Sequence, residues 1–426
     1  MSLFTTLLKS HALPLKSQGK SMLPILQPDD TVYFKKTSFA SIKIDDLIVF
    51  QKKRQLLSHR VIYKGKKYLI TKGDNTLISD GKIYPQQILG KIYQVKRGGK
   101  ILHPETLYLI QSTLYFQEIV KVKNAFDKEK INYVFLKGLP LHLYFEKTQP
   151  KRIYADCDVL VDKKDFLKAQ NILFSFSYQK ADTSLSSFYK DTNKQMVENT
   201  YVKIINKIGV AFDLHTQLVF MMTQLSHLNL IYPRQLLESL TKEFLKNKKE
   251  VIINKEKFLI LSPQFLILYL ALHLFHHNFR GAFRYQFLDR VIRFSISWQK
   301  STKKDLLWLN LSKLINRYQL NNFVYPSFLL LKKYYATPLP QSFLLSIKPK
   351  NFLTSQLINR LIKINIFNDE SRIKAGINRF LNLFLFSPQP IWQKLMVFFH
   401  PQVVYSIIWV LLLKGKTLIK SILYKF

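Results

Sequence analysis

A serine, a histidine and two aspartates follow one another along the first 100 residues, in an order that could support nucleophilic catalysis. They are Ser21, His59, Asp74 and Asp80. A serine hydroxyl is a weak nucleophile that needs a base within hydrogen-bond reach, and a neutral histidine is such a base. An aspartate on the far side of the imidazole ring holds the required tautomer. Composition alone makes this a weak signal, because Ser, His and Asp occur together in most domains by chance.

A second set of residues could hold a divalent metal ion. In "RIYADCDVLV" the residues Asp156 and Asp158 are two apart, and side chains two apart on a strand share a face. Two carboxylates at such a short distance repel each other unless a cation lies between them. Asp213 stands in a later apolar run, "VAFDLH", just before His215. Three aspartates on neighbouring strands would bind two Mg²⁺ about 4 Å apart, the arrangement used in nucleotidyl transfer. A bare Asp-x-Asp is more often a solvated strand end, so this prediction depends on Asp213.

The elements that must position the first set are short strands. The runs "DTVYF", "DLIVF", "RVIYK", "KYLIT" and "ILGKIYQVK" are rich in Val, Ile and Tyr, and Asp, Gly and Lys turns separate them. This pattern predicts a small β-rich domain over residues 1–100.

The second set requires a different kind of domain. From residue 101, apolar residues recur at three- and four-residue spacing, which predicts helices. "INYVFLKGLPLHLYF" and "ADCDVLV" then predict a strand, a glycine turn, a helix and a further strand. We therefore expect an α+β multidomain chain, with a mixed domain over 101–345 and a basic, apolar helical tail over 346–426.

Five ordered segments of the first domain resemble the S24/S26 peptidase superfamily, which includes signal peptidase I. They are "GKSMLPILQPDDTVYF", "IDDLIVF", "SHRVI", "TKGDNTLISD" and "ILGKIYQVK", over about residues 15–95. The resemblance implies that Ser21 is the nucleophile. His59 stands where many bacterial members carry a lysine base, as in the Ser-His subclass. It further implies that Asp80 supports His59 and that Asp74 is structural or assisting.

The same resemblance implies a peptide or protein substrate, no cofactor, and an oxyanion hole that uses the backbone N–H of Ser21. The chain departs from the family at two turns, where Asp29 and Asp45 replace glycines. Aspartate tolerates left-handed backbone better than most residues, so we expect the turns to be retained.

The second domain resembles nucleotidyltransferases of the DNA polymerase β superfamily. "FLKG", "RIYADCDVLV", "VAFDLH" and the later "LALHLFHH" and "FRYQFLDRVIRF" are most similar to an uncharacterised nucleotidyltransferase-like family found beside peptide-modification genes, over roughly residues 105–300. The resemblance implies a nucleoside triphosphate substrate and Mg²⁺ on Asp156, Asp158 and Asp213. Gly138 would allow close approach of the phosphates, and Lys137 or Arg152 would supply positive charge to them.

Two features of this domain bear on its activity and do not affect the predicted fold. Leu139 follows Gly138 where the superfamily has Gly-Ser or Gly-Gly. His273 and His277 share a helix face and could bind a metal, but no carboxylate or cysteine stands at ligand spacing in that helix, so packing is the favoured interpretation.

The formal net charge of +38 admits three explanations. They are nucleic-acid binding, an anionic membrane surface, and solvated lysine-rich faces. Lysines are spread along the whole chain, and only 20 residues precede Ser21, so a nucleic-acid partner is disfavoured. The single cysteine, Cys157, excludes an intrachain disulfide and fits a reducing compartment.

The tail predicts contact with a membrane. Residues 395–413 are 19 uncharged residues between Lys394 and Lys414, long enough to span a bilayer. Pro401 and its polar neighbours favour a helix lying on an anionic membrane surface, and a helix packed on the transferase domain stays a third alternative. Residues 1–20 lack the long apolar core of a signal peptide, so we expect both domains in the cytoplasm, membrane-associated through the tail.

Taken together, these patterns predict a serine endopeptidase fused to a Mg²⁺-dependent nucleotidyltransferase that matures a peptide substrate. Two alternatives stay open. One half could only bind substrate, in a regulatory fusion, or the chain could be a self-cleaving, repressor-like protein that binds nucleic acid.

Overall fold

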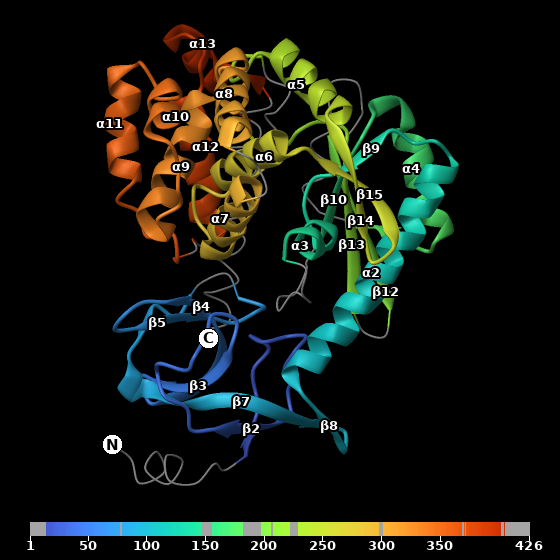
Figure 1. The fold of residues 1–426 in the computed structure, drawn as a ribbon, viewed down its shortest axis with the longest axis vertical. Coiled ribbons are helices and arrows are strands. Elements are labelled where there is room, and N and C mark those ends of the chain that lie inside the picture. The colour runs from blue at the N-terminus through green and yellow to red at the C-terminus, as the bar shows by residue number, and fades with distance from the viewer. Residues whose placement is uncertain are drawn as a thin grey trace.

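The protein has an α+β architecture of two sheets and a group of helices (Figure 1). The computed structural model describes residues 14–76, 79–146, 156–181, 197–205, 208–221, 229–297, 301–368, 370, 372–401 and 404. The predicted fold class is confirmed.

The first sheet is antiparallel and is built from residues before 103. Its strands are β1 (Leu15–Lys16), β2 (Thr31–Lys35), β3 (Leu47–Lys52), β4 (Gln55–Lys64), β5 (Leu69–Lys72), β6 (Lys82–Ile83), β7 (Ile88–Arg97) and β8 (Lys100–Leu102). Their order is β1-β2-β7-β3-β4-β5-β6, with β8 beside β7. Two small buried clusters pack against this sheet. The five strands predicted from apolar runs are all present.

The two turns in which aspartate replaces the glycine of the resembled family have a left-handed backbone. Asp29 and Asp45 have φ values of 70° and 76°. Aspartate adopts this region more readily than most residues, because its short polar side chain bonds locally to the backbone. The expectation that these turns survive the replacement of glycine is confirmed.

The second sheet is mixed. Its strands are β9 (Tyr133–Phe135), β10 (Cys157–Val161), β11 (Gln179–Lys180), β12 (Glu198–Ile205), β13 (Ile208–His215), β14 (Lys248–Ile253) and β15 (Glu256–Leu261). Their order is β11-β12-β13-β10-β9-β15-β14. The pairs β10–β13 and β9–β15 are parallel, whereas the other pairs are antiparallel. The central strand β10 is buried along its whole length.

A 25-residue helix, α2 (Pro104–Lys128), connects the two sheets (Figure 1). Near its start, Tyr108 packs in a core cluster of the first sheet. Further along, Tyr115, Ile119 and Phe126 pack in the large core of the second sheet. One helix therefore contributes to both hydrophobic cores. The shorter helices of this region are α3 (Leu139–Glu146), α4 (Phe166–Ser175) and α5 (Arg234–Lys246).

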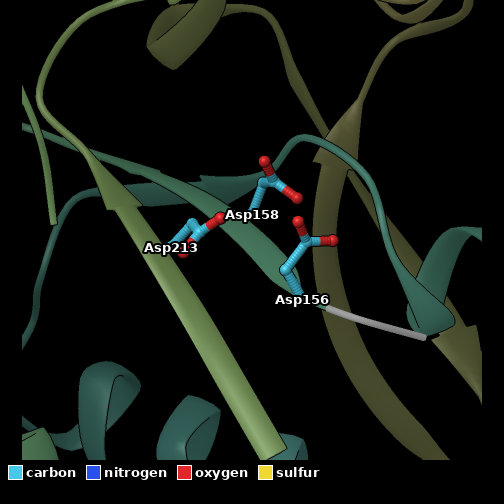
Figure 2. Close-up of side chains that lie close together, drawn as sticks. All are labelled: Asp156, Asp158 and Asp213. Atoms are coloured by element: carbon cyan, nitrogen blue, oxygen red, sulfur yellow. The ribbon is translucent and has the colours of Figure 1, made fainter. Parts of the chain in front are cut away.

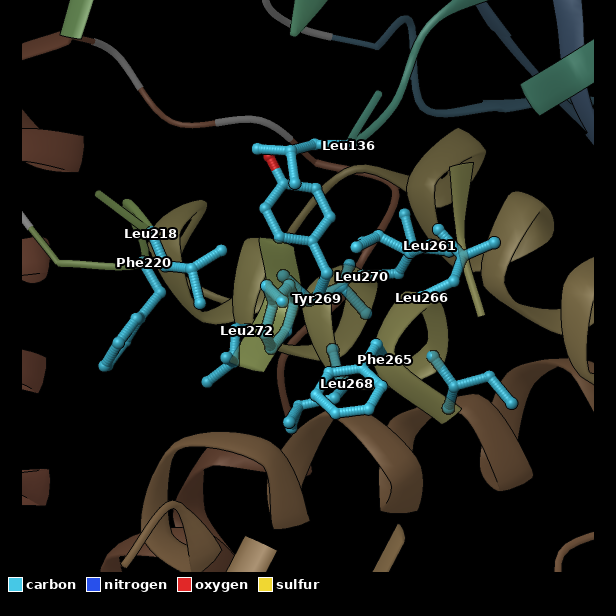
Figure 3. Packing of buried hydrophobic residues seen from close by; sticks show 14 of the residues in the cluster. Leu136, Leu218, Phe220, Leu261, Phe265, Leu266, Leu268, Tyr269, Leu270 and Leu272 are labelled. Atoms are coloured by element: carbon cyan, nitrogen blue, oxygen red, sulfur yellow. The ribbon is translucent and has the colours of Figure 1, made fainter. Parts of the chain in front are cut away.

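The remaining helices form a group around α6 (Pro263–His276). Every residue from Phe265 to Leu272 is buried, so α6 is apolar all round, as expected of a helix inside a core. Figure 3 shows Leu218 and Phe220 beside this helix. The helices that follow are α7 (Ala282–Ser297), α8 (Ser301–Arg317), α9 (Asn321–Tyr335), α10 (Gln341–Ser346), α11 (Phe352–Leu361), α12 (Arg372–Phe386) and α13 (Ile391–Met396).

The apolar segment 395–413 lies mostly outside the described residues, which end at residue 404. Within the described ranges, no helix combines the length and the apolar content needed to cross a bilayer.

Candidate active sites

Three carboxylates meet on the second sheet (Figure 2). Asp158 on β10 is the register partner of Asp213 on the parallel strand β13, and Asp156 stands just before β10. One oxygen of each carboxylate lies within 4.8 Å of the others. Asp158 and Asp213 are buried, whereas Asp156 is partly exposed. The predicted convergence of the three aspartates is therefore present.

Lys137 is the counter-ion of this cluster. Its Nζ lies 2.9 Å from Asp158 and 3.3 Å from Asp156. Burial lowers the pKa of Lys137, but the two aspartates outweigh burial and hold that pKa above its ordinary value. Lys137 is therefore charged at neutral pH and relieves the repulsion between the carboxylates.

The turn at Gly138 requires glycine. Its φ is 104°, and a Cβ there would lie 3.3 Å from the backbone oxygen of Asp156 and 3.4 Å from Cys157 Cα. The turn therefore passes directly against the start of β10, and α3 begins at the next residue. This places Lys137 and Gly138 beside the cluster, as predicted. Their role toward a nucleotide stays a prediction.

His215 orients Asp158 from the neighbouring strand. Its Nε2 lies 3.1 Å from Asp158 Oδ1, and both side chains are buried. Burial lowers the pKa of His215, but Glu198 and Asp158 outweigh it and raise the pKa to about 9. The imidazole is therefore protonated at neutral pH and donates to Asp158. The sequence carried a signal for this contact, because residues two apart on a strand share a face and His215 is two residues after Asp213.

The carboxylates differ in their protonation. Burial raises the pKa of Asp158, but Lys137 and His215 outweigh it and hold that pKa below its ordinary value. For Asp213, burial and then the charges of Asp158 and Asp156 raise the pKa to about 7. Among the described residues, no hydrogen-bond donor reaches the buried Oδ1 of Asp213. Three oxygen ligands, one of them without a donor, fit a hard divalent cation such as Mg²⁺.

A second constellation lies in the first sheet. His59 Nε2 is 2.9 Å from the Ser21 hydroxyl, and His59 Nδ1 is 2.7 Å from Asp80 Oδ2. The Asp80 carboxylate also accepts from the Thr71 hydroxyl at 2.8 Å, and Lys52 donates to the Asp80 backbone oxygen. With Nδ1 donating to Asp80, Nε2 is left to accept the serine proton. The predicted proximity of Ser21, His59 and Asp80 is present, and their catalytic roles stay predictions.

Asp74 has a different partner. Arg60 donates to both of its carboxylate oxygens, at 2.7 and 2.6 Å, and Tyr108 donates to it at 3.0 Å. Arg60 also donates to the backbone oxygen of Asp45. Asp74 therefore fixes the loop after β5 to β4 and to helix α2, which corresponds to the structural role offered for it.

The backbone at Gly73 passes close to both Ser21 and His59. A Cβ at this position would lie 2.6 Å from the backbone oxygen of Ser21 and 3.1 Å from His59 Nε2. The loop is held there by the Asn75 N–H, which donates to the same oxygen of Ser21 at 2.7 Å. Only glycine leaves room for the serine and the histidine to meet.

Arg152, for which a phosphate-binding role was predicted, lies outside the described residues. Asp289 pairs with Arg293 at 2.9 Å and accepts from Thr337 at 2.6 Å, so its contacts are structural.

Comparison with known proteins bears on the second half of the chain. No curated protein and no solved structure matches the chain. The family described as uncharacterised nucleotidyltransferase matches residues 106–336, which is more than half of the 426 residues and includes the three clustered aspartates, Lys137 and Gly138. The match begins at residue 106, so it does not bear on the first sheet. The chain belongs to the uncharacterised nucleotidyltransferase family.

Proposed function

We propose that the chain transfers a nucleotidyl group from a nucleoside triphosphate in a Mg²⁺-dependent reaction. The observation that carries this proposal is the convergence of Asp156, Asp158 and Asp213 around one position. Mg²⁺ held there would neutralise the phosphate oxygens and the charge that develops on them during transfer.

Other residues of the chain would orient the carboxylates and the substrate. Lys137 and His215 keep Asp158 ionised and fixed in direction. Asp213 contributes its buried Oδ1, which no donor among the described residues reaches, to the oxygen set that would hold Mg²⁺. The Gly138 turn brings backbone close to the same position without a side chain in the way.

Calorimetry with Mg²⁺ and each of the four nucleoside triphosphates tests this proposal. We expect wild type to bind at least one of them only when Mg²⁺ is present. The double variant Asp156→Asn/Asp158→Asn should lose that binding, whereas the surface control Asp305→Asn should keep it. Absence of heat for wild type with all four nucleotides would contradict the proposal.

We further propose that the first sheet carries a serine hydrolase acting on a peptide bond. The observation that supports it is the chain of contacts from Ser21 through His59 to Asp80. The Ser21 oxygen would attack the carbonyl carbon while His59 Nε2 takes its proton. His59 would then return that proton to the leaving amine, and water would release the acyl group from Ser21.

A serine-reactive phosphonate probe tests the hydrolase proposal. Wild type should be labelled, Ser21→Ala should not, and Ser41→Ala, an exposed serine of the same domain, should be labelled like wild type. Equal labelling of wild type and Ser21→Ala would contradict it.

We also propose that α12 and α13 lie on an anionic membrane surface. Ile377, Leu381 and Leu385 are four residues apart along α12 and are all exposed. On α13, Ile391 and Trp392 are 72% and 60% exposed. From residue 371 onward the chain has eight Lys or Arg and no Asp or Glu, which complements anionic lipid.

A further inference from the structure

A cavity of about 360 Å³ lies between the two halves of the chain and is lined by residues of both. Lys72 and Gly73, from β5 and the loop after it, form part of one side. Lys137, Gly138 and Asp156 form another part, so the carboxylate cluster borders this cavity through Asp156. The first sheet is therefore a wall of the transferase cleft.

Two cations from different halves approach one aromatic ring in this cavity. Lys72 Nζ lies 5.6 Å from the ring centroid of Phe283, and the guanidinium of Arg284 lies 4.4 Å from the same centroid. The ring attracts both, because cations favour the face of an aromatic side chain. Lys72 and Arg284 are 212 positions apart in the sequence, and only the docking of the two halves brings them to one place.

The position of Arg284 depends on a glycine. Gly281 has a φ of 98°, and a Cβ there would lie 2.3 Å from Arg284 Nη1. Any other residue at 281 would push the guanidinium away from its present place. Gly281 is itself fixed, because its N–H donates to the backbone oxygen of Ile366 at 2.9 Å. The guanidinium therefore packs against the backbone of Gly281 at the start of α7.

The same lining carries five basic and four acidic side chains. Asp74 pairs with Arg60, Glu146 pairs with Arg290, and Asp156 pairs with Lys137. His273 and His277 also line the cavity, and burial together with nearby positive charge, Arg284 included, holds their pKa values below the ordinary range, so they are neutral. Basic side chains therefore outnumber acidic ones in the lining to which Lys72 and Arg284 belong.

We infer that Lys72 and Arg284 form a two-sided phosphate subsite that binds the polyphosphate of the nucleoside triphosphate, one side coming from each half of the chain. The inference rests on the proposed nucleotidyl transfer and adds that the first sheet completes the substrate site. A triphosphate carries several charges along its length, so it can contact the carboxylate-bound cation and more distant basic side chains at once.

Two ligands test the inference by calorimetry in the presence of Mg²⁺. They are the nucleoside triphosphate that binds wild type most tightly, and inorganic tripolyphosphate, which has no base or sugar. Lys72→Ala and Arg284→Ala should each raise the dissociation constant of both ligands about tenfold or more, because each variant removes a charge-assisted contact. Lys72→Arg should retain most of the affinity. Lys67→Ala, an exposed lysine of the hairpin that precedes β5, should bind like wild type.

The outcomes separate this inference from the transferase proposal. If wild type binds the nucleotide and both alanine variants bind it equally well, the subsite is wrong while the transferase proposal stands. If wild type binds tripolyphosphate in a Lys72-dependent way but binds no nucleotide, the subsite stands and the transferase proposal fails. If wild type binds neither ligand, both are wrong. Loss of nucleotide binding with unchanged tripolyphosphate binding would also overturn the subsite, because the two residues would then contact the base or sugar.

Discussion

At the scale of single residues, the two aspartates that follow His59 in the sequence have different partners. Asp80 contacts the imidazole of His59, whereas Asp74 contacts the guanidinium of Arg60. Each aspartate is 12% or less exposed at the side chain, so burial does not distinguish them. Their partners do, and this makes each aspartate the natural control for the other.

Asp80→Asn should lower the rate of labelling of Ser21 by the phosphonate probe roughly 100-fold or more, because the amide would no longer stabilise the imidazolium or fix its tautomer. Asp74→Asn should instead lower the free energy of unfolding by about 3 kcal/mol, because it weakens a buried ion pair. Its labelling rate per folded molecule should stay near that of wild type. The assignment would be refuted if Asp74→Asn slowed labelling and Asp80→Asn did not.

We expect Glu146 to contribute to the stability of the fold in a pH-dependent way. Burial raises its pKa, but contacts with His142 at 2.9 Å and Arg290 at 2.7 Å outweigh burial and lower the pKa to about 2. A carboxylate whose pKa is lower in the folded state stabilises that state above its unfolded pKa, and the contribution is lost as the pH falls toward 2.

Glu146→Gln should therefore lower the free energy of unfolding by about 1–3 kcal/mol at pH 7. The difference from wild type should shrink between about pH 4.5 and pH 2. Urea denaturation across that range measures it. Glu250→Gln, which removes an exposed pair with Lys257, should show no such trend. A difference from wild type that stays constant with pH would contradict the assignment.

At the scale of elements, the carboxylate cluster depends on parallel pairing of β10 with β13 and on the turn that leads into α3. The register places Asp158 beside Asp213, and the turn at Gly138 passes within 3.3 Å of the backbone oxygen of Asp156. A shift of one residue in this register would turn Asp213 to the other face of the sheet. The site is therefore a property of the strand pairing as much as of the aspartates.

Gly138→Ala tests the turn. Alanine at a φ of 104° is strained and would crowd the start of β10, so the free energy of unfolding should fall by about 1–3 kcal/mol. Mg²⁺-dependent nucleotide binding should weaken as well, because Asp156 would be displaced. Gly209→Ala is the matched control, since a Cβ there meets no described atom within 4 Å. Equal thermal unfolding of the two variants would argue against a constrained turn.

Much of the local structure could be predicted from the sequence, whereas the cavity lined by both halves could not. Short apolar runs bounded by polar or turn residues, such as "DLIVF" and "VAFDLH", identify buried strands. The contact of His215 with Asp158 follows once the strands are paired, because residues two apart on a strand share a face. The approach of Lys72 to Phe283 depends on how the first sheet docks on α7, and no local pattern encodes that docking. The predicted role of Arg152 stays a prediction.

At the scale of the whole molecule, the exposed apolar residues of α12 and α13 predict how the protein behaves near lipid. Ile391→Ser/Trp392→Ser should reduce co-sedimentation with anionic vesicles severalfold, because it removes two exposed apolar side chains that would enter the interface. Leu167→Ser, which alters a leucine that is 69% exposed on α4, should bind like wild type. Binding should also weaken with added salt and with neutral vesicles. Unchanged binding by the double variant would refute the proposed surface.

Gly73 has a consequence for how the sequence can change over evolutionary time. It lines the cavity that the carboxylate cluster borders, and its missing side chain is also the space in which Ser21 and His59 meet. A mutation at this codon would change the surroundings of both proposed sites at once, so selection on either proposed activity would also constrain the other.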